Sequence, residues 1–563
     1  MTVSNIMIHT RFNINVAWRG RRVQRLDSPI LSLWQRGGTQ AGGIGLIGPW
    51  LLILLTSSFA QAIDVPLPGS IPASVYEIEL SYLGEQADPT VTLNGPPDTK
   101  PILPYRPFVP ILNLLPHLTT PQTIGPCREK LTREQNRVVV ELAVDGARKA
   151  LCGQRIGLQP AGRMLDVLSY DALHVRGQAT GRIRLALEDR AGTQREESQM
   201  LATVTGSFDM TIPLRQIGRR LDMRQLTSFV VTTEEANVRI ELEQFTMTQG
   251  PPVVTRPAQV GFWVWGYRAA VADPEPVLTA CRRQGCSRVL LQMPSLSDDD
   301  GIWAAYARFF TRAHTGGIEA FALDGYPEAI QEPYTLADKI QRLLHLVEPR
   351  ALAGVQLDIE PYLLPGFLGD ESGPRRYVEC IDVLKEVIGG RTRLSMVIPF
   401  WLTSLTIGGR PLAYAVMDRV DEVAVMSYRT NLEELEDIAD DTLRYGDLIG
   451  SSVWLAVETT PLPVEHRVLL RRDPRPDRAD AVLDYDRHRL ELTPFSAVAA
   501  DGHRRDWFRV QHRTTVRPER ITFAGRSRSD VSTAVKTLRE TLSHRSFAGV
   551  MIHDLDGFGA LAE

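Results

Sequence analysis

Eight short apolar runs alternate with helical patterns between residues 258 and 563, and this alternation restricts the fold more than any other feature of the chain. Strands are predicted at 260–265, 288–293, 319–323, 354–360, 393–398, 422–427, 453–458 and 549–553. Helices are predicted between them, among others at 275–284, 301–313, 336–347, 375–388 and 530–542. Apolar strands that alternate with amphipathic helices form parallel sheets. Eight such units in about 300 residues predict a (β/α)8 TIM barrel over 258–563.

The regular spacing breaks between residues 459 and 521, an interval too long for one strand-to-strand connection. It contains a charged stretch at 467–489. Because the interval follows the seventh strand, we expect a loop or small insertion over the mouth of the barrel.

The part of the chain before the barrel has a different pattern. Residues 131–250 carry short β runs separated by turn signals, which predicts an antiparallel β-sandwich of the jelly-roll type. Residues 251–257 form a Pro-rich linker, and residues 63–130 are expected to be a Pro-rich lead-in with a few strands.

Residues 1–62 are interpreted as an n-region and a signal peptide. The apolar run at 44–59 follows several arginines and precedes Ala60-Gln61-Ala62, an A-x-A cleavage signature. We therefore expect an exported protein, periplasmic or extracellular, with no membrane span after cleavage. An uncleaved N-terminal membrane anchor is the alternative, and translation starting at Met7 is a further one.

Composition and cysteine spacing exclude several classes of function. A hydrophobic share of 43% and a net charge of −4, with no basic tract, argue for a folded protein that does not bind nucleic acid. The five cysteines lack the spacing of a zinc site, and no phosphate-binding loop follows a strand, so no metal and no cofactor are predicted. A Cys127–Cys152 disulfide suits an exported protein, Cys281 and Cys286 are either a bridge or buried thiols, and Cys380 is left free.

Asp358 and Glu360 stand two residues apart at the end of the fourth predicted strand, so they face the same side, before Pro361 stops the strand. The C-terminal strand ends of such a barrel carry the active site. Two neighbouring carboxyl groups repel each other's charge, so one can stay protonated while the other is ionised. Capping of the backbone or pairing with arginines is the alternative for an isolated pair of this kind.

Polar and aromatic residues recur at the other strand ends, which favours an active site over a purely structural barrel. Carboxylates flanked by aromatic rings are typical of glycoside chemistry. The tryptophans could stack on sugar rings or pack beneath the loops. The residues concerned are Asp324, Tyr428, Arg429, Glu458, His553, Asp554, Trp263, Trp265 and Trp401.

The sequences Leu357-Asp358-Ile359-Glu360 and Met426-Ser427-Tyr428 resemble the fourth-strand and sixth-strand motifs of the chitinase-like superfamily, glycoside hydrolase family 18 and its relatives. The resemblance spans 258–563. It implies that Glu360 donates a proton, that Asp358 orients a substrate acetamido group, and that Tyr428 steadies the reacting group. The preceding β-sandwich resembles the carbohydrate-binding modules that accompany glycosidases, although a structural sandwich without a ligand fits its pattern equally well.

The chain departs from the family at several positions. Ala353 and Gln356 replace acids of the fourth-strand motif, His553 stands where tryptophan is usual, and Arg429 replaces an aspartate. Arg429 suits an acidic or differently decorated glycan better than an N-acetylated one.

Glu458 supports a second mechanism, because retaining glycosidases of the large β/α-barrel clan carry the acid on strand four and a nucleophile on strand seven. Carboxyl groups about 5–5.5 Å apart would fit that mechanism. We therefore predict an exported glycoside hydrolase acting on a polysaccharide, oligosaccharide or cell-envelope glycan, with Glu360 as general acid and either Asp358 or Glu458 as second carboxylate. The alternative is a non-catalytic, lectin-like barrel that binds glycan.

Overall fold

The computed structural model describes residues 13–16, 63–66, 71, 75–83, 90–94, 104–134, 136–144, 151–158, 163–195, 197–250, 259–364, 367, 371–492 and 502–563. The predicted export segment, apart from 13–16, and the linker at 251–257 lie outside these residues. No helix of the described part is long and apolar enough to cross a membrane.

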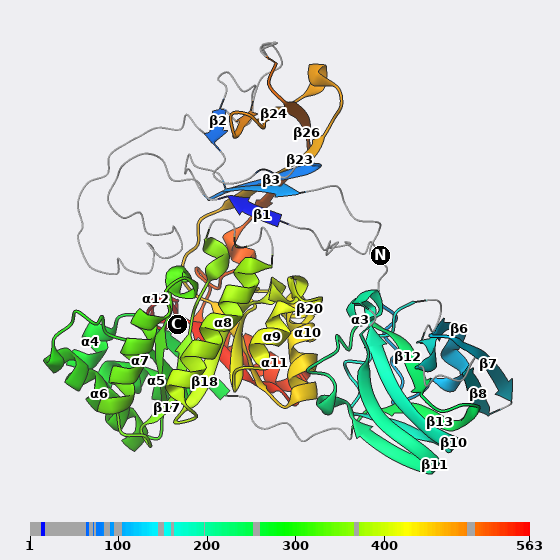
Figure 1. Cartoon of the computed structure of the whole chain (residues 1–563). Coiled ribbons are helices and arrows are strands. Elements are labelled where there is room, and N and C mark those ends of the chain that lie inside the picture. Colours follow the sequence, from blue (N-terminus) through cyan, green and yellow to red (C-terminus); the bar gives the residue numbers. More distant parts are fainter. Residues whose placement is uncertain are drawn as a thin grey trace.

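The C-terminal half forms a closed barrel of parallel strands in chain order, as the alternation of strands and helices predicted (Figure 1). Its strands are β14 (Gln259–Val264), β15 (Arg288–Gln292), β16 (Glu319–Asp324), β17 (Leu352–Leu357), β18 (Arg393–Pro399), β21 (Glu422–Met426), β22 (Ser452–Glu458) and β27 (Phe547–His553). The helices around them are α4 (Tyr267–Ala272), α5 (Glu275–Arg283), α6 (Asp300–Thr315), α7 (Tyr334–Leu346), α8 (Ser372–Ile388), α9 (Leu412–Met417), α10 (Leu432–Ile449), α11 (Arg528–Thr541) and α12 (Leu555–Ala560). Between β18 and α9, the short strands β19 (Thr406–Ile407) and β20 (Arg410–Pro411) pair with each other.

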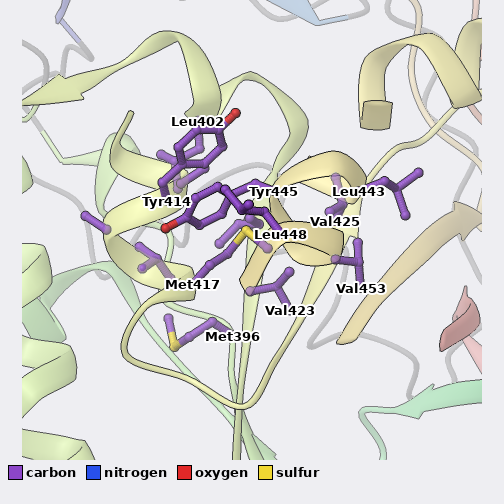
Figure 2. Packing of buried hydrophobic residues seen from close by; sticks show 14 of the residues in the cluster. Met396, Leu402, Tyr414, Met417, Val423, Val425, Leu443, Tyr445, Leu448 and Val453 are labelled. Carbon is purple, nitrogen blue, oxygen red and sulfur yellow. The ribbon is translucent and has the colours of Figure 1, made fainter. Parts of the chain in front are cut away.

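The helices pack on the strands through apolar faces. Figure 2 shows one such contact, in which residues of α9 and α10 cover β18, β21 and β22. The rings of Tyr414 and Tyr445 stack at the centre of this contact, with centroids 3.8 Å apart and an interplanar angle of 7°.

A buried arginine fills the N-terminal end of the barrel. Arg288 of β15 is only 2% exposed, and its guanidinium group lies over the rings of Phe321 and Trp454. It donates hydrogen bonds to Glu319 at 2.7 and 3.0 Å and to the buried Glu422. The N-terminal end therefore has a structural ion-pair network.

A second unit is an antiparallel sheet in the order β6-β9-β12-β10-β13-β8-β7, with β11 and β5 paired to β10 and β13. Its longest strand, β10, pairs with β11, β12 and β13. The strands are β5 (Ile111–Asn113), β6 (Leu118–Ile124), β7 (Cys127–Glu134), β8 (Arg137–Val144), β9 (Cys152–Leu158), β10 (Ala172–Asp189), β11 (Gln199–Pro213), β12 (Leu226–Thr233) and β13 (Val238–Thr248). The short helix α3 (Arg190–Arg195) follows β10. The antiparallel β architecture of this part was predicted, and it begins earlier in the chain than residue 131.

A third sheet joins the beginning of the chain to the excess interval within the barrel sequence. Its order is β1-β4-β3-β23-β26-β24-β25-β2. The N-terminal strands are β1 (Asn13–Val16), β2 (Ile63–Pro66), β3 (Glu77–Leu83) and β4 (Thr90–Asn94). The strands from the interval are β23 (Glu465–Arg472), β24 (Ala481–Asp484), β25 (Arg489–Leu492) and β26 (Arg505–Val516). The predicted lead-in thus contributes strands to two different sheets. The predicted insertion contributes the other strands of the third sheet, which has its own apolar core.

The antiparallel unit of β5–β13 contacts the barrel through one buried and one partly exposed charge pair. Arg444 of α10, with a side chain 2% exposed, donates to both carboxylate oxygens of Asp166 at 2.6 and 2.9 Å. Arg224 reaches Asp441 of α10 at 2.6 Å and lies over the ring of Tyr414. Because Arg444 and Asp166 are both buried, removing either one would leave an uncompensated charge at this contact between the two units.

Four of the five cysteines are paired. Cys127 is bonded to Cys152, the pair that the sequence left as a possible disulfide, and links the start of β7 to the start of β9. Cys281 is bonded to Cys286, which decides between the two alternatives for that pair. Cys380 is free, as expected from the odd number of cysteines, and it is buried, which raises the pKa of its thiol to about 12.

Candidate active site

Asp358 and Glu360 lie directly after β17, at the C-terminal mouth of the barrel. The strand ends at Leu357, three residues earlier than predicted, so the two acids lie between it and the short helix η5 (Pro361–Leu363). The backbone N–H of Asp358 donates to the carbonyl of Asp324 at 2.8 Å. A Cβ atom at Gly325 would lie 2.0 Å from the carbonyl oxygen of Asp358, so this close approach requires glycine.

The two carboxyl groups are held in an environment that disfavours their charged forms. Burial raises the pKa of Asp358 well above its usual range, and the neighbouring Glu360 raises it further. Burial also raises the pKa of Glu360, although Tyr362 and His553 oppose the shift. Oδ1 of Asp358 is buried without a hydrogen-bond partner among the described residues. At least one proton is therefore retained in this pair to higher pH than in water.

Aromatic residues surround Glu360. The hydroxyl of Tyr362 donates a hydrogen bond to Oε1 of Glu360. The ring of Trp401, which is partly exposed, packs edge-on against Tyr362 with centroids 4.8 Å apart. Trp401 thus lies close to Glu360 on the side of β18, where the sequence predicted a sugar-stacking residue. Tyr362 was not predicted, although it follows Glu360-Pro361 directly in the sequence.

Asp324 at the end of β16 has structural partners. Its Oδ1 accepts a hydrogen bond from the N–H of Gly325 at 2.8 Å, and its Oδ2 pairs with the ammonium group of Lys339 on α7. The side chain is 10% exposed. Burial raises its pKa, while Lys339 opposes the shift. Because both oxygens are engaged, Asp324 supports the loop beside Asp358 instead of presenting a free carboxylate to a ligand.

Glu458 at the end of β22 is also fully engaged. One oxygen, Oε1, accepts hydrogen bonds from the N–H of Thr459 and from the N–H and hydroxyl of Thr460, at 2.8, 2.7 and 2.6 Å. The other, Oε2, lies 2.8 Å from Nδ1 of His553. The residue is 2% exposed. A carboxylate with this many donors is held in a fixed position and is poorly placed to attack a sugar.

His553 occupies the position at the end of β27. It is 1% exposed, and its Nε2 lies 3.2 Å from the indole nitrogen of Trp265. The ring of Tyr428 is tilted against it with centroids 6.1 Å apart. Trp265 is partly exposed at the end of β14, so its ring remains within reach of a ligand.

Trp263 does not fit its predicted stacking role. It is 2% exposed, lies inside the barrel and donates its indole N–H to Oε1 of Gln356, whose amide donates to Ser395 at 2.9 Å. Its ring also contacts the edge of His553, with centroids 5.6 Å apart. The two tryptophans differ in depth: Trp263 and Trp265 share one face of the β14 segment, but Trp263 lies one layer deeper inside the barrel. Trp263 can therefore support the site only from inside the barrel, beneath the residues of the mouth.

The remaining predicted residues lie around the mouth. Tyr428 follows β21, and burial together with the nearby Glu458, Asp358 and Glu360 raises the pKa of its hydroxyl well above the usual value. Arg429 donates to the carbonyl of Tyr428 at 2.7 Å and lies over the ring of Phe400. Asp554 caps α12 by accepting the N–H of Gly557 at 2.7 Å, and burial raises its pKa. Tyr428 is therefore a neutral phenol beside the acids, and Asp554 serves in part as a helix cap.

Metal-binding residue types come together elsewhere in the described part of the chain. Asp484, Asp486 and His503 offer ligand atoms within 4.8 Å of one another, at the end of β24 and before β26. Asp484 already accepts hydrogen bonds from Arg505 and His503 through Oδ2, and from two backbone N–H groups through Oδ1. The group is therefore satisfied by the protein itself.

Comparison with known proteins gives partial structural likenesses. No family model matches the chain, and no curated protein matches it in sequence. A chitinase from Chromobacterium violaceum aligns at 12% identity over 54% of this chain and 97% of its own, with a TM-score of 0.31. The spore cortex-lytic enzyme SleL from Bacillus cereus aligns at 9% identity over 55% and 73%, also with a TM-score of 0.31. The CBM22-1–GH10 modules of xylanase 10B from Clostridium thermocellum align at 10% identity over 62% and 80%, with a TM-score of 0.26. At these identities and TM-scores, what the site does has to follow from its own residues.

Proposed function

We propose that this protein is a glycoside hydrolase in which Glu360 is the general acid. The observation that carries the proposal is the Asp358–Glu360 pair at the barrel mouth, where burial raises the pKa of both carboxyl groups. Hydrolysis of a glycosidic bond requires a carboxylic acid that is still protonated near neutral pH, so that it can protonate the leaving oxygen. Burial shifts the pKa of Glu360 in that direction, and its side chain is held by Tyr362, whose ring packs against Trp401.

Asp358 is the proposed second carboxylate. Its oxygen Oδ1 lacks a partner within the described part of the chain, whereas the oxygens of Glu458 are occupied by Thr459, Thr460 and His553. As the leaving group departs, positive charge develops on the sugar ring. Asp358, whose raised pKa favours its protonated form, would orient a substrate group that attacks the charged centre, and the neutral hydroxyl of Tyr428 would donate to the same group. This arrangement favours a mechanism in which a group of the substrate itself attacks the sugar ring over one in which Glu458 attacks it.

The proposed place of action is outside the cytoplasm, in the periplasm or the extracellular medium. The two disulfides, Cys127–Cys152 and Cys281–Cys286, support it, because such bonds persist in oxidising compartments. We further propose that the antiparallel sheet of β5–β13 is a jelly-roll-like module that accompanies the catalytic barrel.

The test compares the full chain with its Glu360→Gln and Asp358→Asn variants on a panel of polysaccharides and cell-envelope glycans, with reducing ends as the readout. We expect both variants to lose about 10²-fold or more in turnover while keeping the glycan affinity of the wild type. Glu328→Gln is the matched control, because Glu328 is an exposed acid in the short helix η4 (Pro327–Ile330) that follows β16. Glycan binding without any product that depends on Glu360 would contradict the hydrolase and favour a lectin-like barrel.

A further inference from the structure

Two arginines and one glutamate lie together at the mouth, beside Tyr428. Arg520 donates to both oxygens of Glu434 at 3.0 and 2.9 Å. Nε of Arg429 lies 3.8 Å from the same carboxylate, which is beyond hydrogen-bond distance. Glu434 therefore neutralises Arg520, and the charge of Arg429 is only partly compensated.

The position of Arg429 is fixed by its surroundings. Nη1 donates to the carbonyl of Tyr428 at 2.7 Å, and the guanidinium lies 5.2 Å from the ring centroid of Phe400, which opens the segment after β18. Phe400 precedes Trp401, whose ring contacts Tyr362 beside Glu360. The N–H of Thr430 donates to the carbonyl of Arg520 at 3.0 Å, and its hydroxyl donates to the carbonyl of Glu519, which ties Arg429 to the segment that returns from the third sheet. The guanidinium thus stands between the ends of β18 and β21, at the mouth of the barrel.

The guanidinium of Arg429 has N–H donors that the described residues do not use. Within the described part of the chain, no side chain or carbonyl accepts a hydrogen bond from its Nη2 or Nε. Its side chain is 23% exposed, so water also compensates the charge only in part. Burial, and after it the neighbouring Arg520, lower the pKa of Arg429, which shows that its positive charge is destabilised where it stands. A bound anion would remove that destabilisation.

We infer that Arg429 forms a subsite for a carboxylate-bearing sugar, such as a uronic acid, at the mouth of the barrel. The planar fork of a guanidinium group matches a carboxylate through two parallel hydrogen bonds. One incompletely compensated cation suits a monovalent carboxylate better than a dianionic phosphate ester. The inference deepens the proposed function, on which it rests for the identity of the ligand as a glycan, and it names acidic glycans as the substrate class.

The experiment measures binding by calorimetry to the full chain carrying Glu360→Gln, so that no probe is consumed. The probes are tetragalacturonate and tetramannuronate, each beside its carboxyl-reduced neutral counterpart. We expect one carboxylated probe to bind more tightly than its neutral counterpart, and Arg429→Gln to weaken that binding about 10- to 100-fold without affecting the neutral sugar. Glu434→Gln is expected to change affinity in the opposite direction, because it removes the competing carboxylate.

Two further variants complete the design. Arg283→Gln on the exposed end of α5 removes a positive charge elsewhere and should leave all affinities unchanged. Thermal unfolding of each variant reports whether it is folded. Equal affinity for charged and neutral sugars, equal effects of Arg429→Gln on both, or no binding of either carboxylated probe at millimolar concentration would overturn the inference. If the wild type cleaves neutral glycans alone, the inferred carboxylate subsite is wrong and the proposed hydrolase function stands. If carboxylated sugars bind but are not cleaved, the proposed hydrolase function is wrong and the inferred subsite stands.

Discussion

Nδ1 of His553 lies 2.8 Å from Oε2 of Glu458, and the two residues are direct neighbours at the paired ends of β22 and β27. The indole nitrogen of Trp265 can only donate, so the Nε2 that faces it must carry a lone pair. The proton of the imidazole is then on Nδ1, where it donates to Glu458. Glu458 therefore fixes the tautomer of His553 and, through it, the orientation of Trp265.

The first prediction concerns this contact. We expect Glu458→Gln to destabilise the fold by roughly 2–4 kcal/mol, because both buried oxygens accept hydrogen bonds and the amide NH2 would face donors in place of one of them. Urea unfolding measures the loss. In a Trp265→Phe background the loss should be smaller, since the Trp265 hydrogen bond that depends on the tautomer is already gone. Unchanged stability, together with turnover that azide restores to Glu458→Ala, would identify Glu458 as a nucleophile instead.

The sequence predicted the barrel because its signal is local: each strand is an apolar run, and each helix between strands is amphipathic. It also located Asp358 and Glu360 at a strand end, although β17 ends at Leu357 since the chain turns there into η5. The role of Glu458 could not be predicted, because it depends on His553, which lies 95 residues further along the chain. The sequence pattern also does not show how deep a side chain lies inside the barrel, so it predicted the same role for Trp263 and Trp265.

The pairing between the lead-in and the insertion left no local signal either. Residues of β3 lie opposite residues of β23 that are more than 380 positions away, as in the hydrogen bond from Ser81 to Glu465. Each segment alone has the composition of a weak strand, and the alternation of apolar residues does not specify which strand is its partner.

The second prediction is a pH dependence of stability. Because the folded-state pKa of Asp358 is raised, the folded chain binds more protons than the unfolded chain once the pH exceeds about 4, the ordinary value for an aspartate. Stability therefore falls as the pH rises from there through the folded-state pKa. Asp358→Asn removes this contribution, so the stability of the variant relative to the wild type should increase with pH. Denaturant unfolding at several pH values tests this, and a difference that stays constant with pH would contradict it.

The third prediction uses the proton on Glu360. A general acid must be protonated to act, so turnover should fall as the pH rises through the pKa of Glu360, which burial places above the ordinary value for a glutamate. Tyr362 opposes that shift by donating to the ionised form. Tyr362→Phe should therefore move the alkaline limb of kcat/KM to higher pH. An alkaline limb that does not move, or that moves to lower pH, would argue against Glu360 as the acid.

The fourth prediction concerns the N-terminal end of the barrel. Arg288→Met would leave Glu422, which is 3% exposed, without its buried partner, at an expected cost of about 3–5 kcal/mol. The double variant Arg288→Met with Glu422→Met should recover part of that cost, because neither charge then remains buried. Chemical denaturation measures both. Since this end lies opposite the mouth, KM should stay unchanged in whatever fraction folds.

The last prediction tests whether the beginning of the chain and the insertion fold as one sheet. Ile78 of β3 lies directly opposite Leu470 of β23, and the two are 0% and 1% exposed within one apolar core. Each substitution to alanine should cost about 2–4 kcal/mol, as for other buried aliphatic residues. Because the side chains share that core, the double variant should differ from the sum by about 0.5–3 kcal/mol, the range typical of contacting residues. Ile78→Ala with Leu290→Ala, which lies inside the barrel, provides the matched control and should be additive. Additivity in both cycles would mean that β3 and β23 do not pack together in solution.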